Sequence, residues 1–154
     1  IRGSPMSGIT APTADIQPVG TVLALNGLPT TQVGGYPAVA RLTQDLPGTL
    51  AGIYTLNQND LAAYSRYIVA GTWACVMGRS QNTDQGIADL QLDGVSFGTV
   101  DAYGATGVGF LVAAASMVVA TSGVHVVRYI VSTKNVLSSS YQFLCFGLWL
   151  TRTA

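Results

Sequence analysis

The sequence predicts an all-β protein, an antiparallel β-sandwich or jelly-roll-like domain, and three observations support this fold class. The chain contains no glutamate and a single lysine, Lys134, so it is poor in residues that favour helix. Its short apolar or alternating runs are separated by turn residues, most clearly at Asp93-Gly94, a pair typical of β-hairpins. The third observation is the long uncharged run Val108–Ala120, in which both odd and even positions are apolar.

A strand over Val108–Ala120 requires cover on both of its faces, because neither set of alternating side chains is polar. A domain of this size has little material to cover two such strands. The pattern therefore predicts a subunit that completes its core against copies of itself. A helix over Leu111–Ala120 stays an alternative, since alanine favours helix, although the valines and flanking glycines do not.

The length of 154 residues is that of one domain with a short lead-in. Residues 1–6 resemble a cloning remnant. Residues 7–47 contain nearly all the prolines and several glycines, which predicts an irregular lead-in with a short strand. Residues 48–154 are expected to form the sandwich itself.

Within the lead-in, Val19–Leu25 alternates as a short strand, and Ala38–Leu42 fits an edge strand. Asn57–Tyr64 is the one helix candidate, with Asn59 or Asp60 as its N-cap. Strands are then predicted over six further runs: Tyr67–Met77, Ile87–Leu92, Val95–Val100, Val108–Thr121, Val124–Ser132 and Tyr141–Thr151.

Charged residues make up 9% of the chain, where roughly 25% is usual, and the net charge is zero. Such a chain has no basic patch for nucleic acid. The longest apolar runs, Val108–Ala120 and Val136–Leu150, are shorter than the roughly 20 residues of a membrane span and lack flanking basic clusters. We therefore expect no membrane insertion, with a small membrane protein as a rival. Cys75 and Cys145 lie in apolar runs and are expected to be buried thiols, although a disulfide between them is possible.

Three segments resemble the C-terminal receptor-binding tip of bacteriophage tail fibres. Residues 71–78 (GTWACVMG) are similar to the Gly-Thr-Trp-x-Cys-Met-Gly stretch of that family, with Val76 inserted. Residues 148–152 (LWLTR) resemble its Leu-Trp-Leu-Arg ending, with Thr151 interposed. Residues 18–22 (PVGTV) resemble the Pro-x-Gly-Thr opening of the terminal domain. Together these segments cover about a fifth of the chain.

The resemblance implies a homotrimer at the distal end of a tail fibre on the virion. Such a tip recognises a bacterial surface glycan or protein receptor during adsorption, commonly a polysaccharide. No enzyme activity and no cofactor are expected. Trp73 and Trp149 are expected to pack in the core rather than to contact a ligand.

The rival functions are a receptor-degrading glycosidase tip and a trimeric ligand domain of the tumour-necrosis-factor or C1q kind. A glycosidase needs two carboxyl groups about 5–9.5 Å apart. Asp89 and Asp93, four apart on one strand, would be separated by roughly 13 Å. The single histidine, His125, has no nucleophile motif around it. A metal site built from three copies of His125 on a trimer axis is a weaker hypothesis than a core histidine.

Receptor recognition is expected on the loops between strands. The candidate loops are residues 79–86, 101–106 and 133–141. Tyr103 could stack on a sugar ring, and Asn82, Asp84 and Asp101 could supply hydrogen bonds. Ordinary turns would contain the same residue types.

Overall fold

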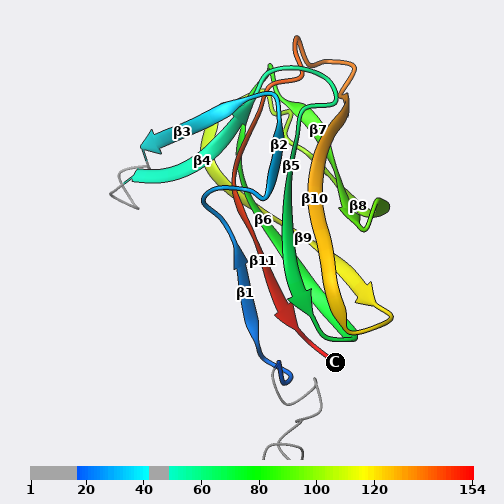
Figure 1. The fold of residues 1–154 in the computed structure, drawn as a ribbon. Coiled ribbons are helices and arrows are strands. Elements are labelled where there is room, and N and C mark those ends of the chain that lie inside the picture. Colours follow the sequence, from blue (N-terminus) through cyan, green and yellow to red (C-terminus); the bar gives the residue numbers. More distant parts are fainter. Residues whose placement is uncertain (1–16, 42–48) are drawn as a thin grey trace, which may run out of the picture.

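The computed structural model describes residues 17–41 and 49–154, which form a sandwich of two antiparallel sheets (Figure 1). The strands are listed here in chain order: β1 (Val22–Leu25), β2 (Thr31–Val33), β3 (Tyr36–Arg41), β4 (Thr49–Thr55), β5 (Leu61–Ile68), β6 (Gly71–Gln81), β7 (Gly86–Leu92), β8 (Val95–Asp101), β9 (Val108–Val119), β10 (Gly123–Lys134) and β11 (Phe143–Arg152).

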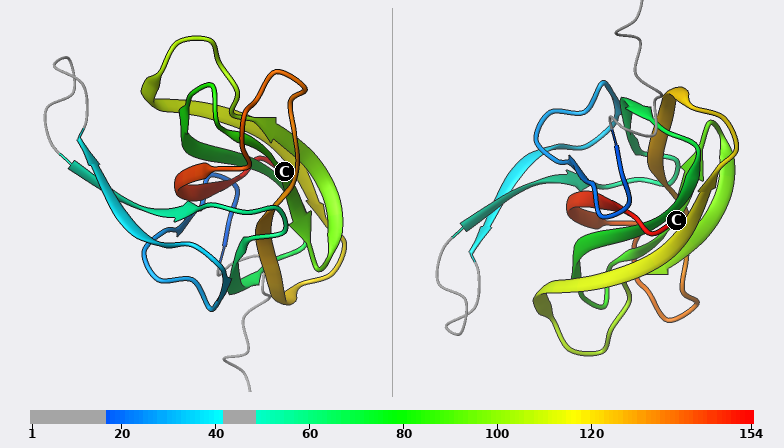
Figure 2. Two further views of the ribbon diagram at one scale, coloured as in Figure 1. Left: turned by 90° about the horizontal axis from the view of Figure 1, so that it is seen from above. Right: turned by 90° about the horizontal axis from the view of Figure 1, so that it is seen from below.

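Sheet A has the strand order β3-β4-β11-β6-β9, with β1 pairing beside β11, and sheet B has the order β2-β5-β10-β7-β8. The first part of β11 pairs with β4 and its last part with β1, while its other edge pairs with β6. The two views of Figure 2 show the β3–β4 pair projecting away from the body of the sandwich. β11 is therefore the strand to which most of sheet A is attached.

The core lies between the two sheets and is built from the inward side chains of both. Its largest fully buried members come from β5, β6, β10 and β11: Tyr64, Trp73, Tyr129 and Phe143. Tyr129 and Phe143 have ring centroids 5.9 Å apart, which joins the two sheets directly. Removing such aromatic surface from water is the main favourable term for a sandwich of this kind.

The all-β antiparallel sandwich predicted from sequence is confirmed. The predicted strands after residue 86 coincide with β7 to β11 within two residues at each end, so the helical alternative for Leu111–Ala120 is wrong. Asp93 and Gly94 have φ angles of 50° and 84°, as a two-residue hairpin turn requires. The edge strand expected near Ala38 is β3, although Leu42 lies outside the described residues. No helix in the described part of the chain is long and apolar enough to cross a membrane.

The helix predicted over Asn57–Tyr64 is wrong, because these residues form a turn followed by the start of β5. Asp60 is buried, and its Oδ2 accepts hydrogen bonds from the backbone N–H groups of Leu56 and Asn57, each at 3.0 Å. Asn59 has a positive φ of 71°, which no helix allows. The Asn and Asp residues that resemble a helix cap therefore stabilise a turn instead.

The single strand predicted over Tyr67–Met77 is also wrong in its bounds, since β5 ends at Ile68 and β6 begins at Gly71. The two strands belong to different sheets, and Gly71 adopts a φ of 150° at the crossing. β2 and β4 were not predicted. β2 has three residues, too few to show a period.

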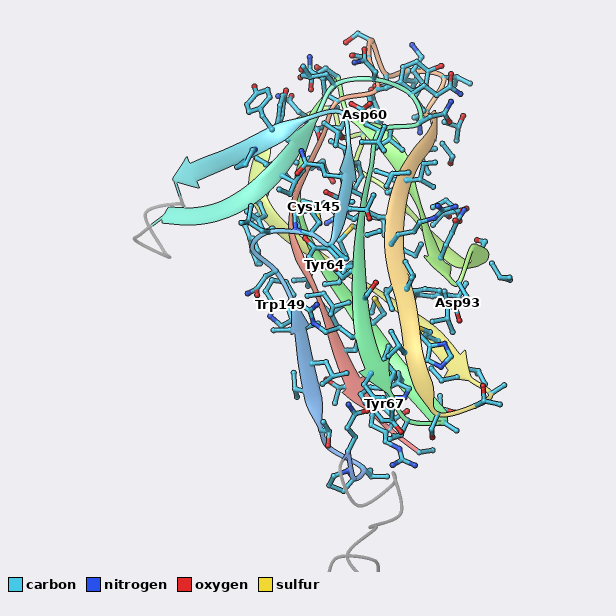
Figure 3. The ribbon with its side chains drawn as sticks, in the orientation of Figure 1. Asp60, Tyr64, Tyr67, Asp93, Cys145 and Trp149 are labelled. Atoms are coloured by element: carbon cyan, nitrogen blue, oxygen red, sulfur yellow. The ribbon has the colours of Figure 1, made fainter. Side chains whose placement is uncertain are left out.

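Of the two tryptophans, Trp73 is in the core as predicted, where its Nε1 donates to the carbonyl oxygen of Val69 at 3.1 Å. The prediction for Trp149 is wrong. It pairs across from Val76 on the outward side of sheet A and is only half-buried (Figure 3). An irregularity in β11 between Cys145 and Gly147 shifts the alternation of side chains by one residue, so the Trp149 side chain points outward instead of into the core.

The expectation that Val108–Ala120 is covered on both faces is not met within one chain. β9 is the edge strand of sheet A, and its outward residues Val112 and Val118 are 61% and 68% exposed. The homotrimer stays a prediction.

The predicted domain limits also stay predictions. Residues 1–6 and the boundary between 47 and 48 lie outside the described residues. The described part of the lead-in supplies β1 and β3 to sheet A and β2 to sheet B.

Replacing Asp60 by alanine should lower the free energy of unfolding by about 1–3 kcal/mol, because the partly buried backbone N–H groups of Leu56 and Asn57 lose their charged acceptor. Urea unfolding followed by tryptophan fluorescence measures this change. Thr106→Ala, at an exposed loop position, should stay within about 0.5 kcal/mol of the parent. Equal stabilities of the Asp60 variant and the parent would contradict the role given to this carboxylate.

Candidate functional site

The three loops predicted to carry recognition meet at one end of the sandwich, the upper end in Figure 1. These connections, residues 82–85, 102–107 and 135–142, are called the loop end below. Isolated bridges join Asn82 to Tyr103 and Gln85 to Gln142, so neighbouring loops are held together. Every second connection falls at the same end because successive strands from β6 to β11 run in opposite directions.

Three of the four predicted site residues are brought together here. Asp101 accepts hydrogen bonds from the backbone N–H of Tyr103 and from Nδ2 of Asn135, both at 2.9 Å. Asn82 donates from its backbone N–H to the carbonyl oxygen of Ala102, and its own carbonyl accepts from Gly104. Asn82 and Asp101 are exposed and Tyr103 is half-buried. Their first role is therefore to set the loop shape, with side-chain surface left for a ligand.

The fourth predicted residue, Asp84, faces a different neighbour, Tyr54 of β4. Burial raises the pKa of Tyr54, and the charge of Asp84 adds to that rise. The hydroxyl of Tyr54 donates to Oε1 of Gln142, and the carbonyl oxygen of Asp84 accepts from the backbone N–H of Gln142 at 3.1 Å. Asp84, Tyr54 and Gln142 thus form one polar group beside the loops.

Sequence reasoning missed an aromatic pair at this point. Tyr36 and Tyr54 have ring centroids 5.7 Å apart at an interplanar angle of 52°, and Tyr36 is 50% exposed. They are paired neighbours on β3 and β4. The alternating Ile53-Tyr54-Thr55 run is the one sequence signal that could have found β4 and hence the pair.

Gln85 is the buried residue that ties the loops to the sheets. Its carbonyl oxygen accepts from the hydroxyl of Ser138 at 2.7 Å, and its Oε1 accepts from the backbone N–H of Leu144 at 3.3 Å. A groove of about 250 Å³ opens beside it, lined by Ser80, Gln81, Asn82, Gln85 and residues 107–109. This lining offers amides and a hydroxyl but no charged group.

The guanidinium of Arg79 lies close enough to Asp101 to feel its charge and, within the described part of the chain, lacks hydrogen-bond partners for part of its nitrogen atoms. Its Nε and Nη1 atoms are buried without a hydrogen-bond partner among the described residues. Burial lowers the pKa of Arg79, and the nearby Asp101 carboxylate opposes that change. Arg79 therefore balances the charge of Asp101 from inside the sandwich.

A second polar group lies away from the loop end, at the β7–β8 turn, where Figure 3 labels Asp93. Nδ1 of His125 lies 2.6 Å from Oδ2 of Asp93, and Nε2 lies 2.7 Å from the carbonyl oxygen of Thr121. Oδ1 of Asp93 accepts from the backbone N–H of Val126 at 2.8 Å. Both ring nitrogens face acceptors, so only the protonated imidazole satisfies both contacts.

The pKa values of Asp93 and His125 both shift in the direction that favours the charged form of each residue. The pKa of Asp93 is lowered, first by the hydrogen bond from Val126 and then by that from His125. Partial burial opposes the charged form of His125, but the hydrogen bonds to Asp93 and Thr121 raise its pKa overall. The pair also borders a groove of about 520 Å³ between β8 and β9 that includes Phe97 and Ser116.

Both cysteines are free and buried, as expected for core thiols. Burial raises the pKa of Cys75 and of Cys145 to about 12. Thiols held neutral in this way are poor nucleophiles at neutral pH.

Metal-ligating side chains do not gather in groups of three or more within residues 17–41 and 49–154. His125 already uses both ring nitrogens inside the subunit. The weaker hypothesis, a metal site built from three copies of His125 on a trimer axis, would require one of those hydrogen bonds to be given up.

No family model matches the chain, and a search of curated proteins finds no significant match. Solved structures do resemble it. A xanthan lyase from Paenibacillus aligns with a TM-score of 0.65 and 21% identity over 84% of this chain, which spans 13% of the lyase. The CBM36-1 domain of a xylanase from the Trinervitermes trinervoides hindgut metagenome aligns with a TM-score of 0.58 and 19% identity, over 87% of this chain and 98% of the domain.

A carbohydrate-binding module from Cellvibrio mixtus lichenase 5A, solved with cellotriose, has a TM-score of 0.57 and 13% identity, over 88% of this chain and 99% of the module. At these identities the likeness establishes the fold. The chain is an antiparallel β-sandwich like the jelly rolls of carbohydrate-binding modules.

The Asp93–His125 pair predicts a pH-dependent contribution to stability. Because the pKa of His125 is raised in the folded state, its contribution is present below its ordinary pKa and is lost as pH rises through the folded value. Because the pKa of Asp93 is lowered, its contribution is present above its ordinary pKa and is lost on acidification. Asp93→Asn, which keeps the turn and an acceptor for Val126, should therefore destabilise the chain more at about pH 5 than at about pH 8.

Urea unfolding at a series of pH values measures this difference. Asp89→Asn removes a carboxylate from the same sheet without touching His125, and its effect should change little over the same range. A Asp93→Asn difference that is constant or grows toward pH 8 would contradict the ion pair.

Proposed function

We propose that this chain is a non-catalytic glycan-binding domain whose binding surface is the loop end together with the Tyr36–Tyr54 pair. The observation that carries the proposal is an aromatic pair, exposed at Tyr36 and half-buried at Tyr54, beside Asp84 and Gln142. The pair lies at the end of the sandwich where hydrogen bonds fix three loops. Sugar rings combine apolar C–H faces with many hydroxyl groups. A site for them needs an aromatic surface and neutral donors and acceptors.

The polar groups at the loop end match this chemistry. Ser80, Gln81, Asn82 and Gln85 line the groove with amides and a hydroxyl, which can both donate and accept. Asp101 is already held by Tyr103 and Asn135, so the loop keeps one shape before a ligand arrives. Preformed loops reduce the entropy lost on binding.

A binding role, rather than hydrolysis, is supported by the way the carboxylates are used. Asp89 is held by Gln91 and Ser96 on the outer side of sheet B, and Asp93 is paired with His125. Asp101 shapes its own loop. The similarity of the fold to modules such as the one solved with cellotriose gives further support.

In finer terms, we propose that the domain is the receptor-binding tip of a phage tail fibre, trimeric, located at the distal end of the fibre on the virion, and directed at a bacterial surface glycan. Its support is the resemblance of residues 18–22, 71–78 and 148–152 to that family. These three segments are neighbours in sheet A, since Val22 and Ala74 both pair with Thr151. Because the three segments contact one another in the fold, we expect a protein that retains one of these sequence patterns to retain the others.

The test is binding to a glycan panel that contains cello- and xylo-oligosaccharides, purified bacterial capsular polysaccharides and lipopolysaccharides. For the best ligand, Tyr36→Ala, Asp84→Asn and Tyr103→Ala should each weaken binding about tenfold in calorimetry, since they remove aromatic area or a hydrogen bond. Tyr67→Ala is the matched control. This exposed tyrosine lies at the opposite end of the sandwich (Figure 3) and should bind normally when replaced.

The outcomes separate the general from the finer proposal. Binding only to the cello- and xylo-oligosaccharides would support a glycan-binding domain and contradict its placement on a phage tail fibre. Steady release of new reducing ends would contradict the non-catalytic role. Binding that is unchanged in Tyr36→Ala, Asp84→Asn and Tyr103→Ala would contradict the site.

A further inference from the structure

The outer face of sheet B carries charged side chains among its exposed valines, and these charges distinguish it from the outer side of β6, β9 and the last part of β11. The outer face of sheet B carries a hydrogen-bonded network in which Nε of Arg128 donates to Gln91 at 2.6 Å, Gln91 donates to Asp89 at 2.8 Å, and Ser96 also donates to Asp89. Charged and polar residues arranged in this way are typical of a surface in water.

The outer side of β6, β9 and the last part of β11 is built from uncharged side chains. The register places Val76 across from Ala114 on one side and Trp149 on the other, all pointing outward. Val112, Ser116 and Val118 continue the face along β9. The name "apolar face" below means these six residues: Val76, Val112, Ala114, Ser116, Val118 and Trp149.

An aromatic group stands at one end of the apolar face. Phe110 and Phe146 have ring centroids 5.6 Å apart. A Cβ atom on Gly78 would lie 2.9 Å from Phe110 and 3.1 Å from Trp149, so the rings lie directly on the sheet at a position without a side chain. The aromatic end is fixed within the subunit, while Val112 and Val118 remain 61% and 68% exposed.

We propose that the apolar face is the surface through which copies of this chain associate. The inference stands on the packing alone and does not depend on glycan binding. The six residues of the face carry no charge, and Asp93 and His125, which share a groove with Ser116 and Val118, are already paired with each other. A copy of the chain can therefore cover the face with no charge left unpaired, whereas a charged partner would lose hydration without compensation. A glycan would find few hydrogen-bonding groups there.

The size of the face agrees with this occupant. β6, β9 and β11 have 11, 12 and 10 residues. At about 3.3 Å per residue and about 4.8 Å between strands, these three strands with β1 present a footprint of roughly 500–700 Å². Stable interfaces bury about 600–1,000 Å² per partner. The edge strand β9 is long, uncharged and free of proline. Soluble monomers rarely leave an edge strand of this kind uncovered.

The test is the mass of the purified full chain in light scattering over a range of micromolar concentrations. The parent should have a multiple of the 16.0 kDa chain mass. Val118→Lys should shift the mass to that of one chain at the same concentration. Val124→Lys is the matched control, because Val124 is equally exposed, at 72%, but lies on the outer face of sheet B, and it should keep the parent's mass.

Ser116→Lys serves as a second variant, and a thermal melt establishes that each variant is folded. A parent that is monomeric throughout, or a mass unchanged in both face variants, would overturn the proposal. A dimer that both variants dissociate would support the face while contradicting the trimer of the phage setting.

Discussion

The pairing of β11 with three other strands is the constraint on which the rest of the structure depends. One edge of β11 binds β4 and then β1, and the other edge binds β6. Its inward side chains, Phe143 and Leu150, lie in the core, and its outward Trp149 belongs to the apolar face. The connection that precedes it, residues 135–142, is one of the loops at the loop end. A single strand therefore links the core, the surface proposed for glycan binding and the surface proposed for self-association.

Those two surfaces are compatible because they lie at different places on the molecule. The loop end closes one end of the strands, with Tyr36 and Tyr54 beside it on β3 and β4, whereas the apolar face runs along the outer side of β6, β9 and the last part of β11. Copies that pack through the apolar face would leave their loop ends free. Several loop ends presented together would bind a repeating polysaccharide more tightly than one, since the later contacts are intramolecular. This gain would be a physical reason for the two proposed surfaces to occur in one chain.

Local patterns made most of the fold predictable from sequence, and the errors have physical causes. Asp93-Gly94 demands left-handed backbone at both positions, so the β7–β8 hairpin could be predicted from two residues. Asn57 to Asp60 can cap either a helix or a turn, and only the buried acceptor position of Asp60 decides between them. Trp149 points outward because of an irregularity in β11 that no period-two pattern contains. In the site, the loops were predictable from turn chemistry, but Tyr36 and Tyr54 meet only through strand pairing.

The most direct test of the central claim, that the loop end binds glycan, is a map of backbone amide chemical shifts in the 15N-labelled chain during titration with the best oligosaccharide from the panel. The expected result is a set of shifts confined to the loop end, residues 82–85, 102–107 and 135–142, and to the neighbourhood of Tyr36 and Tyr54. Shifts concentrated at the β7–β8 turn around Asp93, or on the apolar face around Val118, would contradict it.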